Sequence, residues 1–282
     1  MNKSYRAYLR IKRDKENKAQ KRKIKMQQYD NYESLITYTN FCYAFRKCLR
    51  NVSWKYSVQA YKQSAAYEIT DIISRLLKED YPELRDIIIK DIYERGKRRE
   101  IHSVHIRDRV PQRALCDKAL LPLLKDTLIY DNSASLEGKG TDFTRKRMSL
   151  HLIKAIKEYG TDFYVLKYDF KNFFNSIPHK LCRDVLSKYI SDERIVWMTM
   201  EVIKSYSRVD VKKSDLSPEE KQKQLKLIDN DLFTGLCLGS QVSQVMALIV
   251  ANELDHFVKD KCGFKHYIRY MDDVVVIAKT KQ

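Results

Sequence analysis

The stretch Tyr270-Met271-Asp272-Asp273 joins two apolar segments near the end of the sequence. Residues 267–270 lead into it and the apolar run 274–278 leads out, so the pattern predicts a β-hairpin with two acids in its turn. Asp is common in turns, and an Asp-Asp pair between two strands therefore has a plain structural explanation when it stands alone.

A third acid, Asp169, ends another predicted strand, residues 163–168, about a hundred residues earlier. Two strand ends that together supply three carboxylates suit a site that holds two divalent metal ions. Such a pair of ions stabilises both the attacking and the leaving oxygen of an in-line phosphoryl transfer. The sequence therefore predicts phosphoryl-transfer chemistry at these strand ends.

The charge of the chain indicates a polyanionic partner. Its 282 residues contain 54 Lys or Arg against 37 Asp or Glu, a formal net charge of +17. Nucleic acid is the first candidate. An anionic membrane is the alternative, but the sequence has no apolar run long enough to cross a bilayer, so we expect no membrane association.

The basic residues are most concentrated in an N-terminal segment, residues 1–28. Within residues 1–25, eleven Lys or Arg stand against two acids. This segment is either a solvated helical face or an electrostatic clamp on a phosphate backbone.

Six cysteines are scattered without any Cys-x-x-Cys pair, which favours neither a zinc site nor a disulfide framework. The N-terminus also lacks the apolar core of a secretory signal. Both observations predict a cytoplasmic protein.

The remaining sequence predicts mixed helices and strands. We expect two or three helices within residues 29–97, a strand at 98–106, a helix from 107 to about 130, and a helix at 142–159 after a loop that contains Gly138-Lys139-Gly140. Such a loop can hold phosphate, although its spacing is not that of a Walker A motif. Helices are then predicted at 178–190, 193–206 and 245–259. Residues 207–231 are predicted to form an exposed connector, in which Ser217-Pro218 can start a helix. Residues 234–244 are predicted to form a loop that contains Gly235 and Gly239.

This order of motifs resembles that of reverse transcriptases. The shared features are a basic strand, a Gly-Lys loop, a strand ending in Asp169 with Phe173-Phe174 after it, a Gly-x-x-x-Gly loop before a helix, and Tyr-Met-Asp-Asp. The resemblance covers roughly residues 95–282. Segments 106–115 and 138–141 are most similar to bacterial enzymes of group II introns, diversity-generating retroelements and abortive-infection defence systems.

The resemblance implies an α+β right-hand polymerase fold. Residues 29–160 would form mainly helical fingers, and residues 161–282 a palm that is incomplete at its C-terminus, with an antiparallel sheet backed by helices. The sequence ends nine residues after Asp273, whereas the family's palm continues with further strands and a mostly helical thumb follows. We therefore expect the thumb to be absent from this chain, and a missing C-terminal thumb or an accessory protein to supply that part.

The resemblance also implies a catalytic role for Asp169, Asp272 and Asp273. Asp169 and Asp272 would be the main ligands of two Mg²⁺ ions, for which Mn²⁺ can substitute, with the Phe170 carbonyl as a further ligand. Asp273 would be the accessory acid. Hard oxygen ligands together with substrate phosphates suit Mg²⁺.

The remaining implied roles concern the substrates, which are dNTPs, an RNA template and a DNA or RNA primer. Phe174 matches the steric gate that packs on the dNTP sugar and rejects a 2′-hydroxyl. Arg99 matches the fingers cation that contacts the triphosphate, and Gly239 lies in the loop beneath the nascent base pair. The residues implied to contact nucleic acid, or in the case of the arginines to brace the fingers, are Arg107, Arg109, Arg113, Lys139, Ser243 and Gln244.

The loop before the last helix departs from the common family pattern. Many reverse transcriptases have Gln-Gly where this chain has Leu238-Gly239, and Ser-Pro where it has Ser243-Gln244. This variant resembles the diversity-generating enzymes, which copy an RNA repeat with errors at template adenines. Loss of a polar side chain near the incoming base leads us to expect lowered fidelity.

Two alternatives to an RNA-copying enzyme remain open. One is a defence-associated reverse transcriptase whose DNA synthesis is protein-primed or template-independent. The other is a catalytically inactive RNA-binding fragment. The intact set of three acids argues against inactivity, because carboxylates that repel one another have no structural reason to be kept together.

Overall fold

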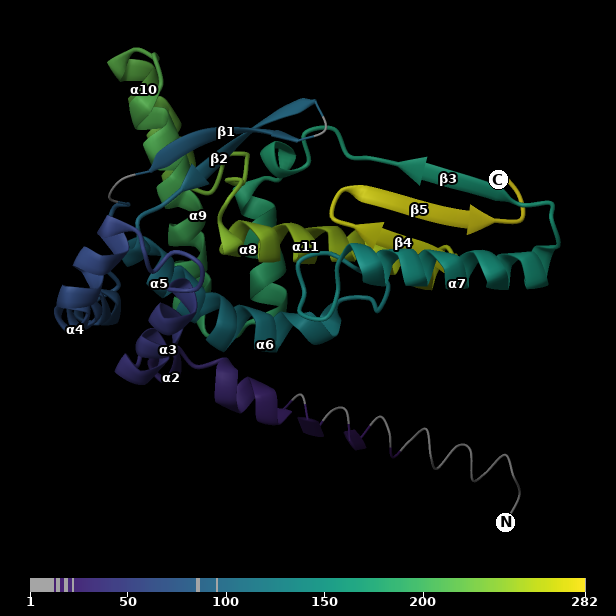
Figure 1. The fold of residues 1–282 in the computed structure, drawn as a ribbon, viewed down its shortest axis with the longest axis horizontal. Coiled ribbons are helices and arrows are strands. Elements are labelled where there is room, and N and C mark those ends of the chain that lie inside the picture. Colours follow the sequence, from purple (N-terminus) through teal and green to yellow (C-terminus); the bar gives the residue numbers. More distant parts are fainter. Residues whose placement is uncertain are drawn as a thin grey trace.

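The structure is a computed structural model that describes residues 13, 16–17, 20–21, 23–84, 87–94 and 96–281. Its larger part is a set of helices around a buried apolar core, and a three-stranded sheet with one long helix beside it extends from this part (Figure 1). The clamp predicted for residues 1–28 lies largely outside the described residues. Within the part that the structure describes, no helix is both long and apolar enough to span a membrane.

The first helices are α2 (Tyr32–Leu35), α3 (Tyr38–Cys48) and α4 (Tyr56–Leu77). The side chains of Asn31 and Thr37 cap α2 and α3 by accepting hydrogen bonds from first-turn N–H groups. Tyr32 is fully buried, and its hydroxyl donates to the Leu76 carbonyl at the end of α4. The helices predicted in this segment are confirmed as far as residue 77.

Residues 88–94 belong to the segment 29–97, for which only helices were predicted, but they form a strand. Strand β1 (Ile88–Glu94) pairs antiparallel with β2 (Lys97–Ser103), and Gly96 takes a positive φ of 78° in the turn. The apolar residues of β1 recur at spacings that suit a helix as well as a strand. Pairing with β2, which was predicted as a strand, decides between the two.

A nearly continuous helical segment follows the hairpin and runs through the core. It consists of α5 (Ile106–Leu115), a π-helical turn (Cys116–Leu120), α6 (Leu121–Leu124) and a 3₁₀ turn (Lys125–Thr127). Several of its side chains, such as Val110 and Leu120, are fully buried. This confirms the helix predicted from residue 107 to about 130. Helix α7 (Thr141–Tyr159) follows the Gly-Lys loop as expected.

The four later helices are α8 (His179–Tyr189), α9 (Glu193–Lys213), α10 (Pro218–Asp229) and α11 (Gln241–His256), which ends in a π-helical turn (Phe257–Lys261). The Ser240 side chain accepts a hydrogen bond from the Ser243 N–H, so α11 begins four residues before the predicted start at residue 245.

Residues 207–231 are mostly helical, so the prediction of a solvated connector loop is wrong, although most residues of α10 are exposed as predicted. Helix α9 continues to Lys213, and α10 begins at the predicted Ser217-Pro218, where Ser217 forms a capping box with Glu220. The nearly buried Lys204 pairs with Asp231 at 2.8 Å. Ion pairs of this kind between α9 and the end of α10 stabilise a segment whose sequence is too polar to show a clear helical period.

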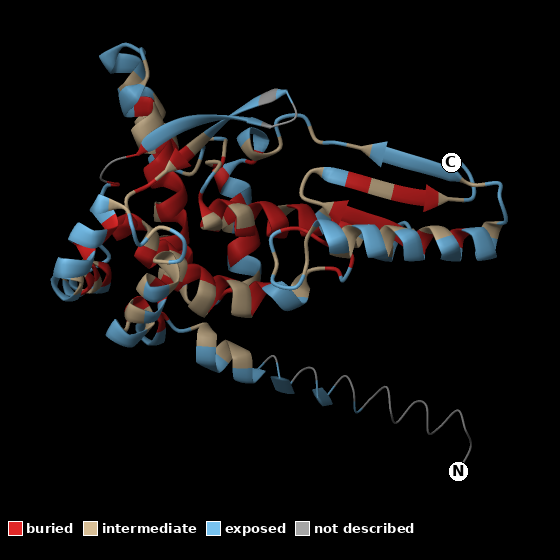
Figure 2. Ribbon diagram, in the orientation of Figure 1, coloured by how far each residue is buried: buried red, intermediate tan, exposed pale blue. Residues whose placement is uncertain are grey.

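The sheet contains β3 (Tyr164–Tyr168), β4 (His266–Tyr270) and β5 (Asp273–Ala278), in the order β3-β5-β4 and antiparallel throughout. Strand β4 is almost entirely buried, whereas β3 is an edge strand and is exposed (Figure 2). Tyr164, Val165 and Leu166 of β3 are 43%, 51% and 59% exposed.

Helices cover both faces of the sheet at β4. Successive strand residues point to opposite faces, and Tyr267 donates its hydroxyl proton to Asp255 of α11 while His266 contacts His151 of α7. The predicted α+β fold, with an antiparallel sheet backed by helices, is confirmed. The boundary between fingers at 29–160 and palm at 161–282 stays a prediction.

Candidate active site

The β3–β5 register brings Asp169 to the same end of the sheet as Asp272 and Asp273. Tyr168, the residue before Asp169, pairs with Val274, the residue after Asp273. Tyr270 pairs with Asp273 across the hairpin, so Asp272 lies in the turn between β4 and β5. Asp169 therefore meets the Asp272-Asp273 pair, about a hundred residues later in the sequence, at one end of the sheet.

The electrostatics of Asp272 show how close the acids lie. Partial burial raises the pKa of its carboxyl group, and the negative charges of Asp169 and Asp273 raise it further, against a hydrogen bond from its own backbone N–H that lowers it. Two carboxylates that share a site disfavour each other's ionisation. A cation placed between Asp169 and Asp272 would remove this repulsion.

Asp273 differs from Asp169 and Asp272 because it forms an ion pair with a lysine of β3. Its carboxylate is 3.2 Å from the Lys167 ammonium of β3, and both side chains are largely exposed. Within the described ranges, no three His, Cys, Asp or Glu side chains are arranged as a ready metal site. Mg²⁺ is commonly held by one or two carboxylates together with substrate phosphates, and Asp169 with Asp272 fits that smaller donor set.

An arginine that the sequence analysis missed holds in place the turn that carries Asp272. Arg269, fully buried in β4, donates from Nη1 to the Met271 carbonyl at 3.0 Å. The same guanidinium makes two hydrogen bonds of 2.7 Å to the Asp255 carboxylate and a third bond to the Leu248 carbonyl, both on α11. The sequence signal that could have drawn attention to it is an arginine inside the otherwise apolar strand segment 267–270, although its partners are not visible in the sequence.

Aromatic side chains follow Asp169. Phe170 and Phe173 have ring centroids 5.5 Å apart, and Phe173 and Phe174 lie edge to face at 5.6 Å. Phe174 is half-buried, and its carbonyl accepts a hydrogen bond from Leu236 N–H in the glycine loop. This contact places the predicted steric-gate residue between the Asp169 strand and the loop before α11.

The glycine loop also contacts the β1–β2 hairpin. The Leu238 carbonyl accepts a hydrogen bond from His102 N–H of β2 at 2.9 Å. Gly239 has φ +110°, and a Cβ at this position would lie 2.6 Å from the His102 carbonyl oxygen. Glycine is therefore required at residue 239 by the close approach of β2, whatever its predicted role at the base pair.

The arginines predicted to contact the substrates lie in two different environments, one on β2 and the other on α5. Arg99 is exposed on β2, opposite Ile92. The three arginines of α5 contact the protein itself: Arg107 is nearly buried 3.9 Å from Glu68, Arg109 donates to the Ser103 hydroxyl, and Arg113 pairs with Asp117 at 2.8 Å. These contacts favour bracing of the fingers, and contact with a template stays a prediction.

The last three predicted contact residues also interact with the protein. The Lys139 ammonium donates to the backbone carbonyls of Tyr130 and Asn132. Ser243 is buried within α11, and Gln244 is half-buried. Whether any of them also contacts nucleic acid stays a prediction.

An aromatic group beside Lys139 was not predicted. Tyr130 is 65% exposed and lies edge to face with Phe143. The Arg147 guanidinium and the Lys139 ammonium lie 4.9 and 5.4 Å from its ring centroid. Asn132 forms a parallel bridge with Arg269 at the outer edge of β4, so this group is connected to the strand that leads into the turn with Asp272.

Paired acids at the end of an antiparallel sheet suit the binding of the divalent metal ions that phosphoryl transfer uses. The family model described as reverse transcriptase (RNA-dependent DNA polymerase) matches residues 86–282. The chain therefore belongs to the reverse transcriptase family, whose domains use divalent metal ions.

Comparison with curated proteins finds no match. Among solved structures, the chain is similar to an apo telomerase from Candida tropicalis truncated from its C-terminal domain, with 14% identity, a TM-score of 0.45, and coverage of 74% of this chain and 48% of the telomerase. It is also similar to chains of a partial and a complete Cas6-RT-Cas1–Cas2 complex. Each has 15% identity and a TM-score of 0.44, with 88% of this chain covered. The chain spans 38% and 24% of those two, and thus about half or less of each structure.

Proposed function

We propose that this chain copies an RNA template into cDNA by nucleotidyl transfer, with two Mg²⁺ ions held by Asp169 and Asp272. The observation that carries the proposal is the strand register that brings Asp169 to the same end of the sheet as Asp272, within a domain of the reverse transcriptase family. The Phe170 carbonyl is the further ligand in this proposal. Mn²⁺ can replace Mg²⁺.

The chemistry is divided between the ions and the chain. When bound, the ions lower the pKa of the primer 3′-hydroxyl and stabilise charge on the transferred phosphoryl group. Asp169 and Asp272 supply the negative charge that holds them, and the Arg269 contact with the Met271 carbonyl fixes the turn that carries Asp272. Positioning and electrostatics supply most of the rate, because phosphoryl transfer needs little covalent help from the protein.

Two further residues, on separate elements, select the substrate in this proposal. Phe174 packs on the sugar of the dNTP, and Arg99 on β2 contacts the triphosphate. The bond between Leu238 and His102 supports this arrangement, because it connects the loop before α11 to the strand that carries Arg99.

The biological role that we favour is a diversity-generating retroelement. The sequence Leu238-Gly239 with Ser243-Gln244 supports it, since these positions resemble the error-prone enzymes of that class. A defence-associated enzyme with protein-primed or template-independent synthesis is the second candidate. An inactive RNA-binding fragment is the third, and the net charge of +17 suits it equally well.

We further propose that an accessory protein or a thumb of the family's type covers β3. Among the described residues no strand pairs with the outer edge of β3, and its apolar side chains are exposed on both faces of the sheet. An exposed apolar edge strand readily pairs with another strand. A cytoplasmic location is proposed from the cysteines, all six of which are free thiols.

Primer extension on an RNA template with Mg²⁺ and dNTPs tests the proposal. We expect extension by the parent chain, a loss of several orders of magnitude for Asp272→Asn, and parent-like activity for the control Asp215→Asn, an exposed acid before α10. Extension without template would favour the second candidate. RNA binding without any extension, in the presence of candidate accessory proteins, would favour the third.

A further inference from the structure

His102 of β2 lies where three elements meet, at the base (the open end) of the β1–β2 hairpin. It pairs there with the apolar Ile89 of β1, whereas Arg99 lies three residues closer to the turn. Its backbone N–H donates to the Leu238 carbonyl of the glycine loop, and its ring Nε2 is 2.8 Å from Asp210 Oδ1 of α9. His102 is only 7% exposed. A single buried residue therefore joins the hairpin to both the loop and the helix.

The last turn of α9 makes further contacts with the same end of the hairpin. Lys213 donates to the carbonyl of Ile87, the residue before β1, at 3.2 Å, and Lys212 forms an ion pair with Glu83 at 2.5 Å. In Figure 1 the hairpin runs from α9 towards the end of the molecule that carries the three-stranded sheet. Helix α9 therefore holds the hairpin at its base, and the strand with Arg99 extends away from this support.

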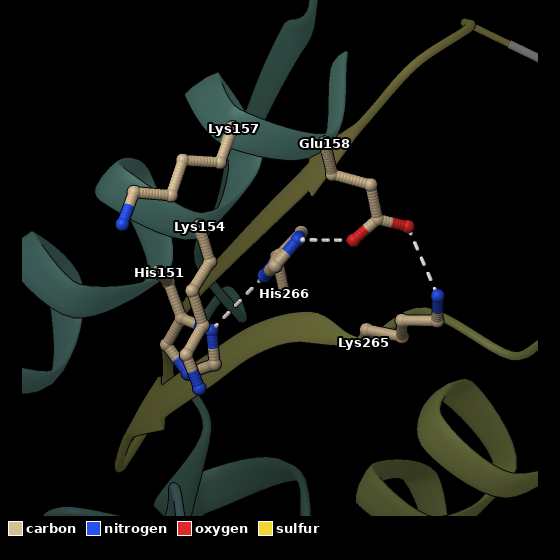
Figure 3. Close-up of a pocket in the computed structure, with 6 residues that line it drawn as sticks. All are labelled: His151, Lys154, Lys157, Glu158, Lys265 and His266. Atoms are coloured by element: carbon tan, nitrogen blue, oxygen red, sulfur yellow. Dashed lines mark hydrogen bonds and ion pairs between the residues drawn. The ribbon is translucent and has the colours of Figure 1, made fainter.

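The buried histidines His151 and His266 provide a contrast. Their Nδ1 atoms are 3.3 Å apart in a pocket between α7 and β4, and a carboxylate lies within 3.4 Å of the Nε2 of each (Figure 3). Each of these rings is thus contacted through both of its nitrogens. The Nδ1 of His102 is buried and has no hydrogen-bond partner among the described residues. Within that part of the chain, the bond with Asp210 is therefore the one hydrogen bond that orients the His102 ring.

The charges around the ring favour the protonated form of His102. The hydrogen bond with Asp210 has the largest effect on the pKa of the imidazole and raises it, against burial, which lowers it. The charges of Asp210 and of Glu100, 3.6 Å from Nε2, raise the pKa further, and Lys213 of α9 lowers it. In the glycine loop, burial raises the pKa of the Cys237 thiol, so this group is neutral. A raised pKa means that the charged pair forms at low pH and is lost as pH rises through the folded value.

We propose that His102 is a positioning residue for the incoming dNTP, because it fixes the base of the hairpin between the glycine loop and α9 and thereby sets the place of Arg99. The inference rests on the proposed function, in which Arg99 contacts the triphosphate. Three residues of strand, about 10 Å, separate the two side chains, so a small tilt at the base moves the guanidinium. Asp169 and Asp272 belong to the other sheet. Loss of the bond with Asp210 should therefore weaken dNTP binding more than it slows the chemical step.

Primer extension between about pH 6 and about pH 9 gives the KM for dNTP and kcat separately. The parent is compared with His102→Gln, which keeps a hydrogen-bond donor but cannot be protonated, with Asp210→Asn, and with the double variant. The matched control is His256→Gln. His256 is also paired with an aspartate, Asp260 at 2.6 Å, and hydrogen bonds to Thr127 and Asp260 raise its pKa, but it lies at the end of α11. Ratios of variant to parent at each pH cancel the ionisation of the dNTP itself.

We expect His102→Gln and Asp210→Asn each to raise the KM several-fold at the acid end of the range, with kcat within about twofold of the parent. The double variant should show no further rise, because the two groups act as one unit. At the alkaline end, where the parent has lost the imidazolium charge, the KM of His102→Gln should approach that of the parent. His256→Gln should match the parent throughout. A KM ratio that does not vary with pH, an equal loss in kcat, or additive effects in the double variant would overturn the proposal.

Amide hydrogen exchange of residues 88–103 tests the same link without catalysis. Protection factors, which remove the intrinsic pH dependence of exchange, should fall for the hairpin in His102→Gln and Asp210→Asn at the acid end, and stay at the parent level in His256→Gln. Unchanged protection in the first two variants would refute the link even in an active polymerase. A fall in protection in a chain that extends no primer would instead contradict the proposed function and support the contact between His102 and Asp210.

Discussion

The Arg269 guanidinium and the Asp255 carboxylate form a fully buried, two-bonded ion pair between β4 and α11, with both hydrogen bonds at 2.7 Å. Arg269 also donates to the Met271 carbonyl, and Tyr267 donates its hydroxyl proton to Asp255 at 2.6 Å. The pair therefore connects the strand, the helix behind it and the turn that carries Asp272.

Asp255→Asn should destabilise the fold and reduce activity. Removing one partner of a buried pair leaves an uncompensated charge, which costs about 3–5 kcal/mol. The exposed pair between Lys180 and Asp184 provides the control, because Asp184→Asn should change stability by less than about 1 kcal/mol. Urea denaturation gives both values. Equal stabilities for the two variants would show that Asp255 does not hold the turn.

Gly239→Ala should disrupt the contact between the glycine loop and β2. The added Cβ would lie 2.6 Å from the His102 carbonyl oxygen, and the backbone φ of +110° is unfavourable for alanine. We expect a loss of stability of about 1–3 kcal/mol together with weaker dNTP binding. Gly263→Ala is the control, since its φ is also positive but a Cβ there meets no atom within 4 Å. Similar losses in the two variants would assign the effect to backbone conformation alone.

Phe174→Val should increase the use of ribonucleotides. In the proposed function Phe174 excludes the 2′-hydroxyl, so a smaller side chain should raise the ratio of rNTP to dNTP kcat/KM by at least about tenfold, which is 1.4 kcal/mol of discrimination. Phe173→Val is the matched control, because Phe173 is its half-buried neighbour in the same aromatic cluster. An unchanged ratio for Phe174→Val would remove the steric-gate role.

Leu238→Gln should lower the error rate if the loop is that of a diversity-generating enzyme. A polar side chain restores a hydrogen bond that can align the incoming base. The Leu238 carbonyl, which accepts from His102, is kept by the substitution, so the loop should retain its position. Sequencing of cDNA made on an adenine-rich RNA template gives the error rate. No change would argue that residue 238 does not set fidelity.

Asp131 should make stability depend on pH on the acid side. Burial alone would raise the pKa of its carboxyl group, but hydrogen bonds with His151, Arg147 and Lys259 outweigh burial and hold the pKa well below its usual range. A depressed pKa stabilises the fold above the unfolded value of about 3.9, and this stabilisation is lost as pH falls through the folded value.

The parent should therefore lose stability steadily below about pH 4. Asp131→Asn should be less stable at pH 7, by about 3–5 kcal/mol, and should lose less on further acidification. Thermal unfolding between pH 2 and pH 7, in steps of about one unit, measures both slopes. Parallel slopes for the two proteins would contradict the ionised state inferred for Asp131.

The sequence predicts those parts of the site that local spacing determines. A turn between two apolar runs identified the Asp272 hairpin, and a strand end identified Asp169. The register that brings them together could be anticipated only through the family resemblance, because strand pairing over a hundred residues leaves no local pattern. The same limit applies to Arg269 and Asp255, whose partnership depends on how α11 lies against β4.

Prediction of secondary structure from the local sequence failed where the spacing of apolar residues suited a helix and a strand equally well. The segment 88–94 has Ile88, Ile89, Ile92 and Tyr93, a spacing that suits one face of a helix, and it became a strand because β2 was available as a partner. The polar segment 207–231 lacked an apolar period, and its helices depend on ion pairs such as Arg208 with Asp229. Neither contact can be read from a window of a few residues.

The strand that carries Asp169 is the least supported strand of the sheet. It is five residues long and bonds to β5 on one side only, whereas β4 is buried beneath helices. Local opening of β3 therefore requires less free energy than opening of β4, and its amide hydrogens should exchange faster. Each opening separates Asp169 from Asp272 without unfolding the rest. In the proposed function, a molecule or segment docked along β3 would therefore raise the fraction of time in which both acids are in place, and with it the turnover rate.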